Sequence, residues 1–180
     1  VIDDSKQRFP DLIYGVDVDN LQTAVVRALS EKGLKLATAE SCTGGYISKR
    51  ITDVAGSSQV FDCGVTSYAN EIKEKILGVR HETLQTYGAV SPQTAREMAD
   101  GVRRISGADL AVSTTGIAGP GGGSAEKPVG LVYVGISSEW HKDVIELKLG
   151  RGYTDERDLI RYVAASHALS QVLKAVRLKK

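Results

Sequence analysis

Three side chains that could attack a substrate or bind an anion follow one another in the segment 39–45, Ala-Glu-Ser-Cys-Thr-Gly-Gly: Ser41, Cys42 and Thr43. An apolar run before them predicts a buried strand, and residues 46–51 read as the start of a helix. Backbone N–H groups in the first turn of a helix lack intrahelical partners and lie at the positive end of its dipole. The segment could therefore hold a phosphate, or present a nucleophile beside an oxyanion hole.

Two further segments, 66–75 and 114–130, are also unusual in composition and also lie where predicted strands pass into loops or helices. In open α/β sheets such positions converge on one crevice, so we interpret the three segments as one site. None of the three contains a histidine, which argues against a Ser-His-Asp triad. The base that remains for a hydroxyl nucleophile is lysine.

Two lysines, Lys73 and Lys75, follow Tyr68 closely. On a helix that begins near Asn70, at most one of them faces the crevice, and Lys73 lies one turn in, close to Tyr68. A lysine acts as a base only where burial or nearby positive charge lowers its pKa. Tyr68 could relay the proton or hold Ser41. The alternative is a solvated helix face with no role in chemistry.

The segment 116–130 is long and rich in glycine, and such a loop in a compact domain is usually functional or disordered. It matches neither the dinucleotide-binding pattern nor the phosphate-loop pattern. Its glycines could bring backbone N–H groups close to a phosphate, although a flexible surface loop is equally compatible with the composition. Arg151 and Arg157, near the start of the last predicted helix, could hold a phosphate or lie on the surface.

Apolar periodicity and capping residues place the elements that would position these groups. The expected helices are 21–33, 43–52, 70–77, 91–107 and one that starts at Thr154; the expected strands are 34–39, 59–69, 109–115, 130–138 and 142–149. Helices alternate with strands before a closing hairpin. This order predicts an α/β fold, a single three-layer domain with a mixed, mostly parallel sheet flanked by helices.

The composition excludes several classes of function. The chain has 180 residues, of which 42% are hydrophobic and 25% charged, and a net charge of +1, so nothing favours direct nucleic-acid or membrane binding. Two cysteines are too few for a disulfide framework, and His81, His141 and His167 are isolated, so no metal site is expected. No signal peptide or long apolar run is present, which makes the cytoplasm the expected location.

Several segments together resemble one known family. They are 38–45, 51–58, 88–91, 115–120 and 127–130, and they resemble the CinA C-terminal domain family, the nicotinamide mononucleotide deamidase family, over roughly residues 20 to 178. The resemblance implies a serine amidase with a Ser-Tyr-Lys arrangement. Ser41, Tyr68 and Lys73 match its catalytic positions, while Cys42 remains a rival nucleophile.

The resemblance also implies an activity: hydrolysis of nicotinamide mononucleotide to nicotinate mononucleotide and ammonia, in pyridine nucleotide (NAD) recycling, with no cofactor and no metal. The N–H groups near Thr43 and Gly44 would stabilise the oxyanion, and Gly45 is expected to bind substrate beside them. The glycine-rich loop and the last helix would hold the ribose phosphate; the residues concerned are Thr115, Gly116, Gly119 and Arg157. The family's pattern around Arg157 differs in this chain, so that match is the least direct.

Residues 1–18 resemble the linker of longer CinA proteins, and residues 19–180 then form the amidase domain. The upstream domain in those proteins is a metal-dependent nucleotide pyrophosphatase, and the family resemblance implies a homodimer or larger homo-oligomer. Two alternatives stay open: a module that binds a phosphorylated ligand without turnover, and an interaction role in competence or DNA damage.

Overall fold

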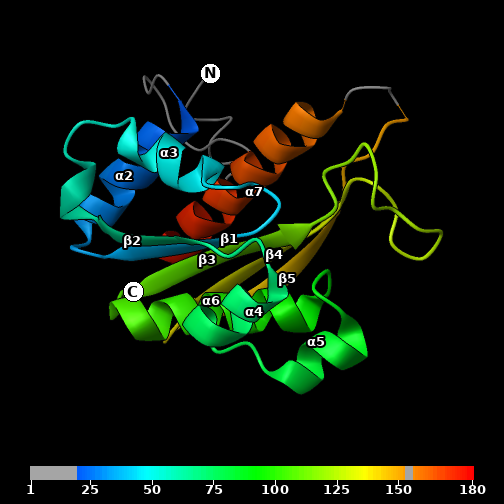
Figure 1. Cartoon of the computed structure of the whole chain (residues 1–180). Helices are drawn as coiled ribbons and strands as arrows, with labels where there is room; N and C mark the ends of the chain where they lie inside the picture. The colour runs from blue at the N-terminus through cyan, green and yellow to red at the C-terminus, as the bar shows by residue number, and fades with distance from the viewer. Residues whose placement is uncertain (1–19, 153–155) are drawn as a thin grey trace.

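A five-stranded sheet forms the middle layer of the domain (Figure 1). The computed structural model describes residues 20–152 and 156–180. The strands are β1 (Leu36–Glu40), β2 (Phe61–Thr66), β3 (Leu110–Gly116), β4 (Leu131–Ser138) and β5 (Lys142–Lys148), in the order β2-β1-β3-β4-β5. β1 pairs in parallel with β2 and β3, whereas β4 pairs antiparallel with β3 and β5. The carboxyl ends of the three parallel strands therefore lie at one edge of the sheet.

Helices cover both faces of this sheet (Figure 1). On one face lie α2 (Leu21–Glu31), α3 (Tyr46–Thr52) and α7 (Arg157–Leu178), and a short 3-10 turn, η1 (Ser57–Gln59), precedes β2. On the other face lie α4 (Asn70–Ile72), the π-helical turn η2 (Lys73–Leu77), α5 (His81–Tyr87) and α6 (Pro92–Ser106). The three-layer α/β fold expected from the sequence is confirmed.

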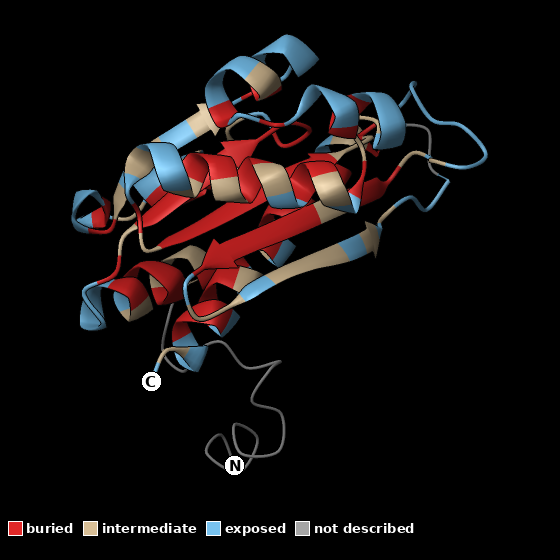
Figure 2. Ribbon diagram, turned by 90° about the horizontal axis from the view of Figure 1, so that it is seen from below, coloured by how far each residue is buried: buried red, intermediate tan, exposed pale blue. Residues whose placement is uncertain are grey.

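Each interface between a helix layer and the sheet has its own apolar core. Side chains of α2, α3 and α7 pack on one face, and those of η2 and α6 pack on the other. Every residue of β1 is buried, which explains why this strand reads as an apolar run rather than as an alternating pattern. Figure 2 shows burial concentrated in the inner strands of the sheet and in the inward sides of the helices, whereas the outer strands β2 and β5 are intermediate or exposed.

Helix ends follow the capping residues that the sequence offers. Asn20 accepts a hydrogen bond from the Thr23 amide at the start of α2, and Ser91 accepts one from Thr94 before Pro92 opens α6. Gly78 and Gly107 end their helices with φ of 70° and 69°, a conformation that glycine adopts without strain.

Some boundaries differ from those expected. α3 begins at Tyr46, as the segment 46–51 indicated, rather than at the start of the expected range 43–52. The segment 70–77 divides into a short α-helix and a π-helical turn. α5 was not expected from the sequence. Thr154 and the expected linker, residues 1–18, lie outside the described residues. Within the described ranges, no helix combines the length and apolar character that crossing a bilayer requires.

Candidate active site

The side chains of Ser41 and Lys73 meet at the carboxyl edge of the parallel strands. Ser41 directly follows β1, and its amide donates to the carbonyl of Thr114 on β3. Lys73 is the first residue of η2, and its Nζ lies 3.1 Å from Ser41 Oγ. Ser41 is 9% exposed and Lys73 only 1%. The two side chains are thus within hydrogen-bond distance and almost completely shielded from solvent.

Two backbone carbonyls fix the orientation of the lysine. Lys73 Nζ donates to the carbonyl of Ser67 at 2.7 Å and to that of Tyr68 at 3.3 Å. Among the described residues no carboxylate pairs with it, and burial lowers the pKa of Lys73 below its ordinary value. A neutral amine has two N–H bonds and one lone pair. With both N–H bonds on these carbonyls, the lone pair is left for the Ser41 hydroxyl.

Packing against α6 sets the position of η2 and hence of Lys73. Gly101 on α6 has no side chain, and the carbonyl of Leu77 at the end of η2 occupies the space that a Cβ atom would need. Arg104 on the same helix donates to that carbonyl at 3.0 Å. A residue larger than glycine at position 101 would push η2, and with it the lysine, away from α6.

The positive end of α3 is occupied by a carboxylate of the chain itself, that of Glu40. Its two oxygens accept from the amides of Gly45, Ile47 and Ser48 at 2.8–3.0 Å. The hydroxyls of Thr43 and Ser48 each donate to it at 2.7 Å. Glu40 is fully buried. The N-terminus of α3 is therefore not free to bind an external phosphate. The Glu40 carboxylate already takes the place of the anion that this turn was expected to bind.

Cys42 differs sharply from its neighbour Ser41. Its side chain belongs to the apolar core beneath α3 and α7. Burial is the main reason that the pKa of the Cys42 thiol is raised to about 12. A thiol of that pKa stays protonated at neutral pH and is a poor nucleophile. The environment therefore favours Ser41 over Cys42.

Tyr68 approaches the lysine through its backbone only. Its side chain is 66% exposed, and its hydroxyl accepts a hydrogen bond from Arg157 Nη2 at 3.3 Å. Arg157 begins α7 and also donates through Nη1 to the carbonyl of Gly119 at 2.6 Å. One guanidinium thus joins the end of β2, the glycine-rich loop and the last helix. A role for the Tyr68 phenol in proton transfer stays a prediction.

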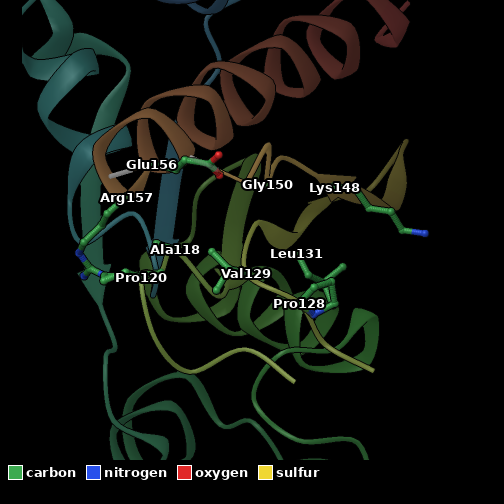
Figure 3. Close-up of a pocket in the computed structure, with 11 residues that line it drawn as sticks. Ala118, Pro120, Pro128, Val129, Leu131, Lys148, Gly150, Glu156 and Arg157 are labelled. Atoms are coloured by element: carbon green, nitrogen blue, oxygen red, sulfur yellow. The ribbon is translucent and has the colours of Figure 1, made fainter. Parts of the chain in front are cut away.

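A pocket of about 620 Å³ lies beside this arginine (Figure 3). Eleven residues line it: Ala118, Gly119, Pro120, Pro128, Val129, Leu131, Lys148, Gly150, Gly152, Glu156 and Arg157. In Figure 3 the Arg157 side chain extends toward Pro120, whereas the Lys148 ammonium points outward. Ser41 and Lys73 are not among the lining residues. The pocket is therefore separate from the serine–lysine pair but is linked to it: Arg157 lines the pocket and bonds the Tyr68 hydroxyl, and the Tyr68 carbonyl bonds Lys73.

The other residues expected to bind substrate have mostly structural partners. Thr43 is buried and bonds Glu40 and Thr114 through its hydroxyl, and the Gly44 amide donates to the carbonyl of Ser41. Gly45 caps α3 with φ of 94°. Among the described residues, the amides of Cys42 and Thr43 make no backbone–backbone hydrogen bond in this turn; their N–H groups instead act on the Cys42 sulfur, a weak acceptor.

At the end of β3, the Thr115 hydroxyl donates to the carbonyl of Ala89 at 2.7 Å. Gly116 lies so close to β4 that a Cβ atom would meet Leu131 and Val132. Of the residues expected in this region, Gly119 alone contacts Arg157, through its carbonyl. Thr115 and Gly116 thus fix the start of the loop that contains Gly119.

Sequence reasoning missed three residues of this region: Glu40, Ser67 and Arg161. An acidic residue that ends a buried strand is a signal that could have revealed Glu40, because buried carboxylates need donors. Arg161 lies one helical turn after Arg157 and donates to the carbonyl of Thr43 at 3.0 Å. Among the described residues no group of three or more His, Cys, Asp or Glu side chains could hold a metal ion.

These observations define a class: a three-layer α/β domain with a buried serine–lysine pair at the ends of parallel strands. The model of the CinA C-terminal domain matches residues 18–176, so the chain belongs to this family. It is 52% identical over 162 residues to a competence-damage inducible protein of Caldanaerobacter subterraneus, and 49% identical over 174 residues to a CinA-like protein of Desulfovibrio desulfuricans. These matches cover 90% and 96% of the chain but only 38% and 40% of the two relatives.

Solved structures agree with this assignment. The competence/damage inducible protein CihA from Agrobacterium tumefaciens superposes with a TM-score of 0.83 at 43% identity, over 92% of this chain and 98% of that one. A CinA superfamily protein from Escherichia coli superposes with a TM-score of 0.81 at 27% identity, over 93% and 98% of the two chains.

Proposed function

We propose that this domain is an amidohydrolase that deamidates nicotinamide mononucleotide through an acyl-enzyme on Ser41. The observation that carries the proposal is the contact of 3.1 Å between Ser41 Oγ and Lys73 Nζ, made by a buried lysine with a lowered pKa. A serine hydroxyl needs a neighbouring base to become a nucleophile, and a lysine can serve as that base once it is neutral.

The reaction follows from this geometry. The Ser41 proton passes to Lys73 Nζ as Oγ bonds to the carboxamide carbon, and backbone amides of the turn at Cys42 and Thr43 meet the oxyanion. The carbon–nitrogen bond then breaks, and the nitrogen takes the proton from Lys73 and leaves as ammonia. Water attacks the acyl-enzyme and gives one proton to Lys73, which passes it to Ser41 Oγ as the ester bond breaks. The product leaves as a carboxylic acid and loses its remaining proton to solvent. The short contact favours direct transfer over a relay through Tyr68.

The pocket beside Arg157 supports a site for the rest of the substrate. It offers apolar walls and the guanidinium of Arg157, which suits a phosphate because of its planar pair of donors. In this proposal the ribose phosphate lies by Arg157 and Gly119, and the Tyr68 phenol contacts the nucleotide. The carboxamide then reaches toward Ser41.

The same proposal extends to the longer relatives. Because the chain spans about two fifths of their length, we infer that the domain works beside an upstream domain. We further propose a cytoplasmic protein that forms homo-oligomers and recycles pyridine nucleotides. The mass of the native protein tests for the upstream domain, and its elution on gel filtration tests for the oligomer.

The test is ammonia release from nicotinamide mononucleotide by the unmodified chain and by Ser41→Ala. We expect turnover by the former and a rate below about one-thousandth of it in the variant, because the nucleophile is lost. Full activity in Ser41→Ala would reject the assignment. Binding of the nucleotide without ammonia release between about pH 6 and 10, where a perturbed lysine titrates, would instead favour a binding module.

A further inference from the structure

Ser67 has a buried hydroxyl that no group in the structure satisfies. The residue is fully buried, and its Oγ has no hydrogen-bond partner among the described residues. Its backbone, by contrast, is fully used: the amide donates to the carbonyl of Glu40 at 2.9 Å, and the carbonyl accepts from Lys73 Nζ. A buried unpaired hydroxyl costs about 1–3 kcal/mol, so it calls for an explanation.

The strand pairing shows where this hydroxyl lies. Glu40 of β1 is opposite Thr66 of β2, and the bond from the Ser67 amide to Glu40 continues the ladder by one residue. Ser67 is therefore the neighbour of Ser41 on the adjacent strand. Neighbouring strands are about 4.8 Å apart, so the two serines lie side by side.

Alternation along the strands places both serine side chains on one face. On β1, Ala37 and Ala39 pack toward η2 and α6, whereas Thr38 and Glu40 bond α3 on the other face. Ser41 continues the first set. On β2, Cys63 and Val65 pack toward the same core, and Ser67 continues them. The face that receives both hydroxyls is the face from which Lys73 extends.

From this arrangement we propose that Ser67 is a further catalytic residue of the proposed amidase, whose hydroxyl hydrogen-bonds the carboxamide nitrogen of the substrate. The inference rests on the proposed function. Ser41 and Lys73 already contact each other directly, so a second hydroxyl beside them is not needed to activate the nucleophile. It is placed to bind the group that leaves.

The step balances with Lys73 as the only proton carrier. In the bound substrate Ser67 Oγ accepts one N–H of the carboxamide. Once Ser41 Oγ has bonded to the carbon, the nitrogen becomes pyramidal, and its N–H bond to Ser67 Oγ leaves its single lone pair free to turn toward Lys73. Held in this way, the nitrogen takes the proton that Lys73 received from Ser41, the carbon–nitrogen bond breaks, and ammonia departs. Ser67 keeps its own proton.

The experiment is Ser67→Ala in the full chain, with ammonia release from nicotinamide mononucleotide measured across pH. We expect kcat to fall about 100-fold, as on removal of one preorganised hydrogen bond to a reacting group. The midpoint of the pH profile stays unchanged, because alanine keeps the carbonyl that holds Lys73. The melting temperature does not fall, since an unpaired buried hydroxyl is removed.

Ser113→Ala is the matched control. Ser113 lies on the same face of β3, two residues before Thr115, and its hydroxyl donates to the carbonyl of Ala95 at 2.5 Å. The Ser113→Ala substitution should lower the melting temperature, because this hydrogen bond is lost, and leave kcat unchanged. If the parent chain is active, any of three results for Ser67→Ala overturns the role of Ser67 while leaving the proposed function intact. These results are a kcat within twofold of the parent, a shifted pH midpoint, or a loss of stability as large as that of Ser113→Ala. A parent chain that releases no ammonia overturns the proposed function and this inference with it.

Discussion

Two neighbouring regions of this domain differ in how their polar groups are satisfied. The serine–lysine site (Ser41, Lys73 and the carbonyls of Ser67 and Tyr68) is buried, and Lys73 has three oxygen partners. The arginine pocket (the eleven residues around Arg157) has a volume of about 620 Å³, and apolar side chains and glycines form much of its lining. Arg157 and Tyr68 lie between the two regions.

This difference indicates a division of labour. A dry, preorganised site perturbs a pKa and makes electrostatic interactions strong, which suits bond breaking. A wide pocket with one guanidinium suits recognition of a substrate group that does not react. Changes in the serine–lysine site should therefore lower kcat, and changes in the arginine pocket should raise KM. The predictions below test this separation, from the largest expected effect to the smallest.

Lys73→Met should have the largest effect. It removes the base and should lower kcat about 10²- to 10⁴-fold. In the unmodified chain, kcat/KM should rise with pH through a midpoint below 10.5, because burial lowers the pKa and only the neutral amine accepts the Ser41 proton. Lys75→Met, on an exposed lysine of the same turn, is the matched control and should keep the parent profile. A profile without any rise between about pH 6 and 10 would count against Lys73 as the base.

Arg157→Ala should raise KM for nicotinamide mononucleotide about 10- to 100-fold, through loss of a charge-assisted contact, with a much smaller change in kcat. Arg157→Lys should recover only part of this loss, because an ammonium cannot bridge the Tyr68 hydroxyl and the Gly119 carbonyl as a guanidinium does. Steady-state kinetics separate the two parameters. An equal fall of kcat at saturating substrate would place Arg157 in the chemistry and break the comparison.

Glu40→Gln should act on stability. The amide group brings N–H donors to a place where five donors already converge, so the free energy of unfolding should fall by about 2–4 kcal/mol. Denaturant unfolding measures this change, and Glu31→Gln on the exposed end of α2 is the control that should leave stability unchanged. Stability like that of the parent would mean that the turn does not depend on the buried charge.

Cys42→Ala should have the smallest effect on activity, less than about twofold, because a thiol with a pKa near 12 is protonated at the working pH. It should cost about 1 kcal/mol of stability through the lost packing of the sulfur. A variant that is inactive while Ser41→Ala still turns over would make Cys42 the nucleophile.

Local patterns in the sequence predicted much of the fold. The capping residues Asn20 and Ser91 and the glycines at 78 and 107 act within a few residues of themselves, so the ends of α2, η2 and α6 could be anticipated. The start of α3 was less sharply predicted, at residue 43 or at residue 46, because Gly45 offers no capping side chain and the first amides are satisfied by Glu40, six residues before Tyr46. Helix α5 was not predicted from the sequence because it is short and has few buried residues, so it shows no clear apolar periodicity.

The candidate site was predicted in part. Position and residue type pointed to Ser41 and Lys73, and the structure brings these two into contact. The role of Tyr68 as a relay stays a prediction, since its phenol bonds Arg157. Ser67 carried no signal in the sequence, because its neighbour across the sheet is 26 residues away and only strand pairing joins them.

By itself, the sequence determined which residues can do chemistry, the order of helices and strands, and membership of the CinA C-terminal domain family. The tertiary structure decided which of these residues come into contact and in what environment. Burial lowers the pKa of one lysine and raises that of one cysteine, and a carboxylate of the chain fills the helix end that might have bound phosphate. These outcomes depend on desolvation and on hydrogen bonds between segments that only folding brings together, which no local pattern records.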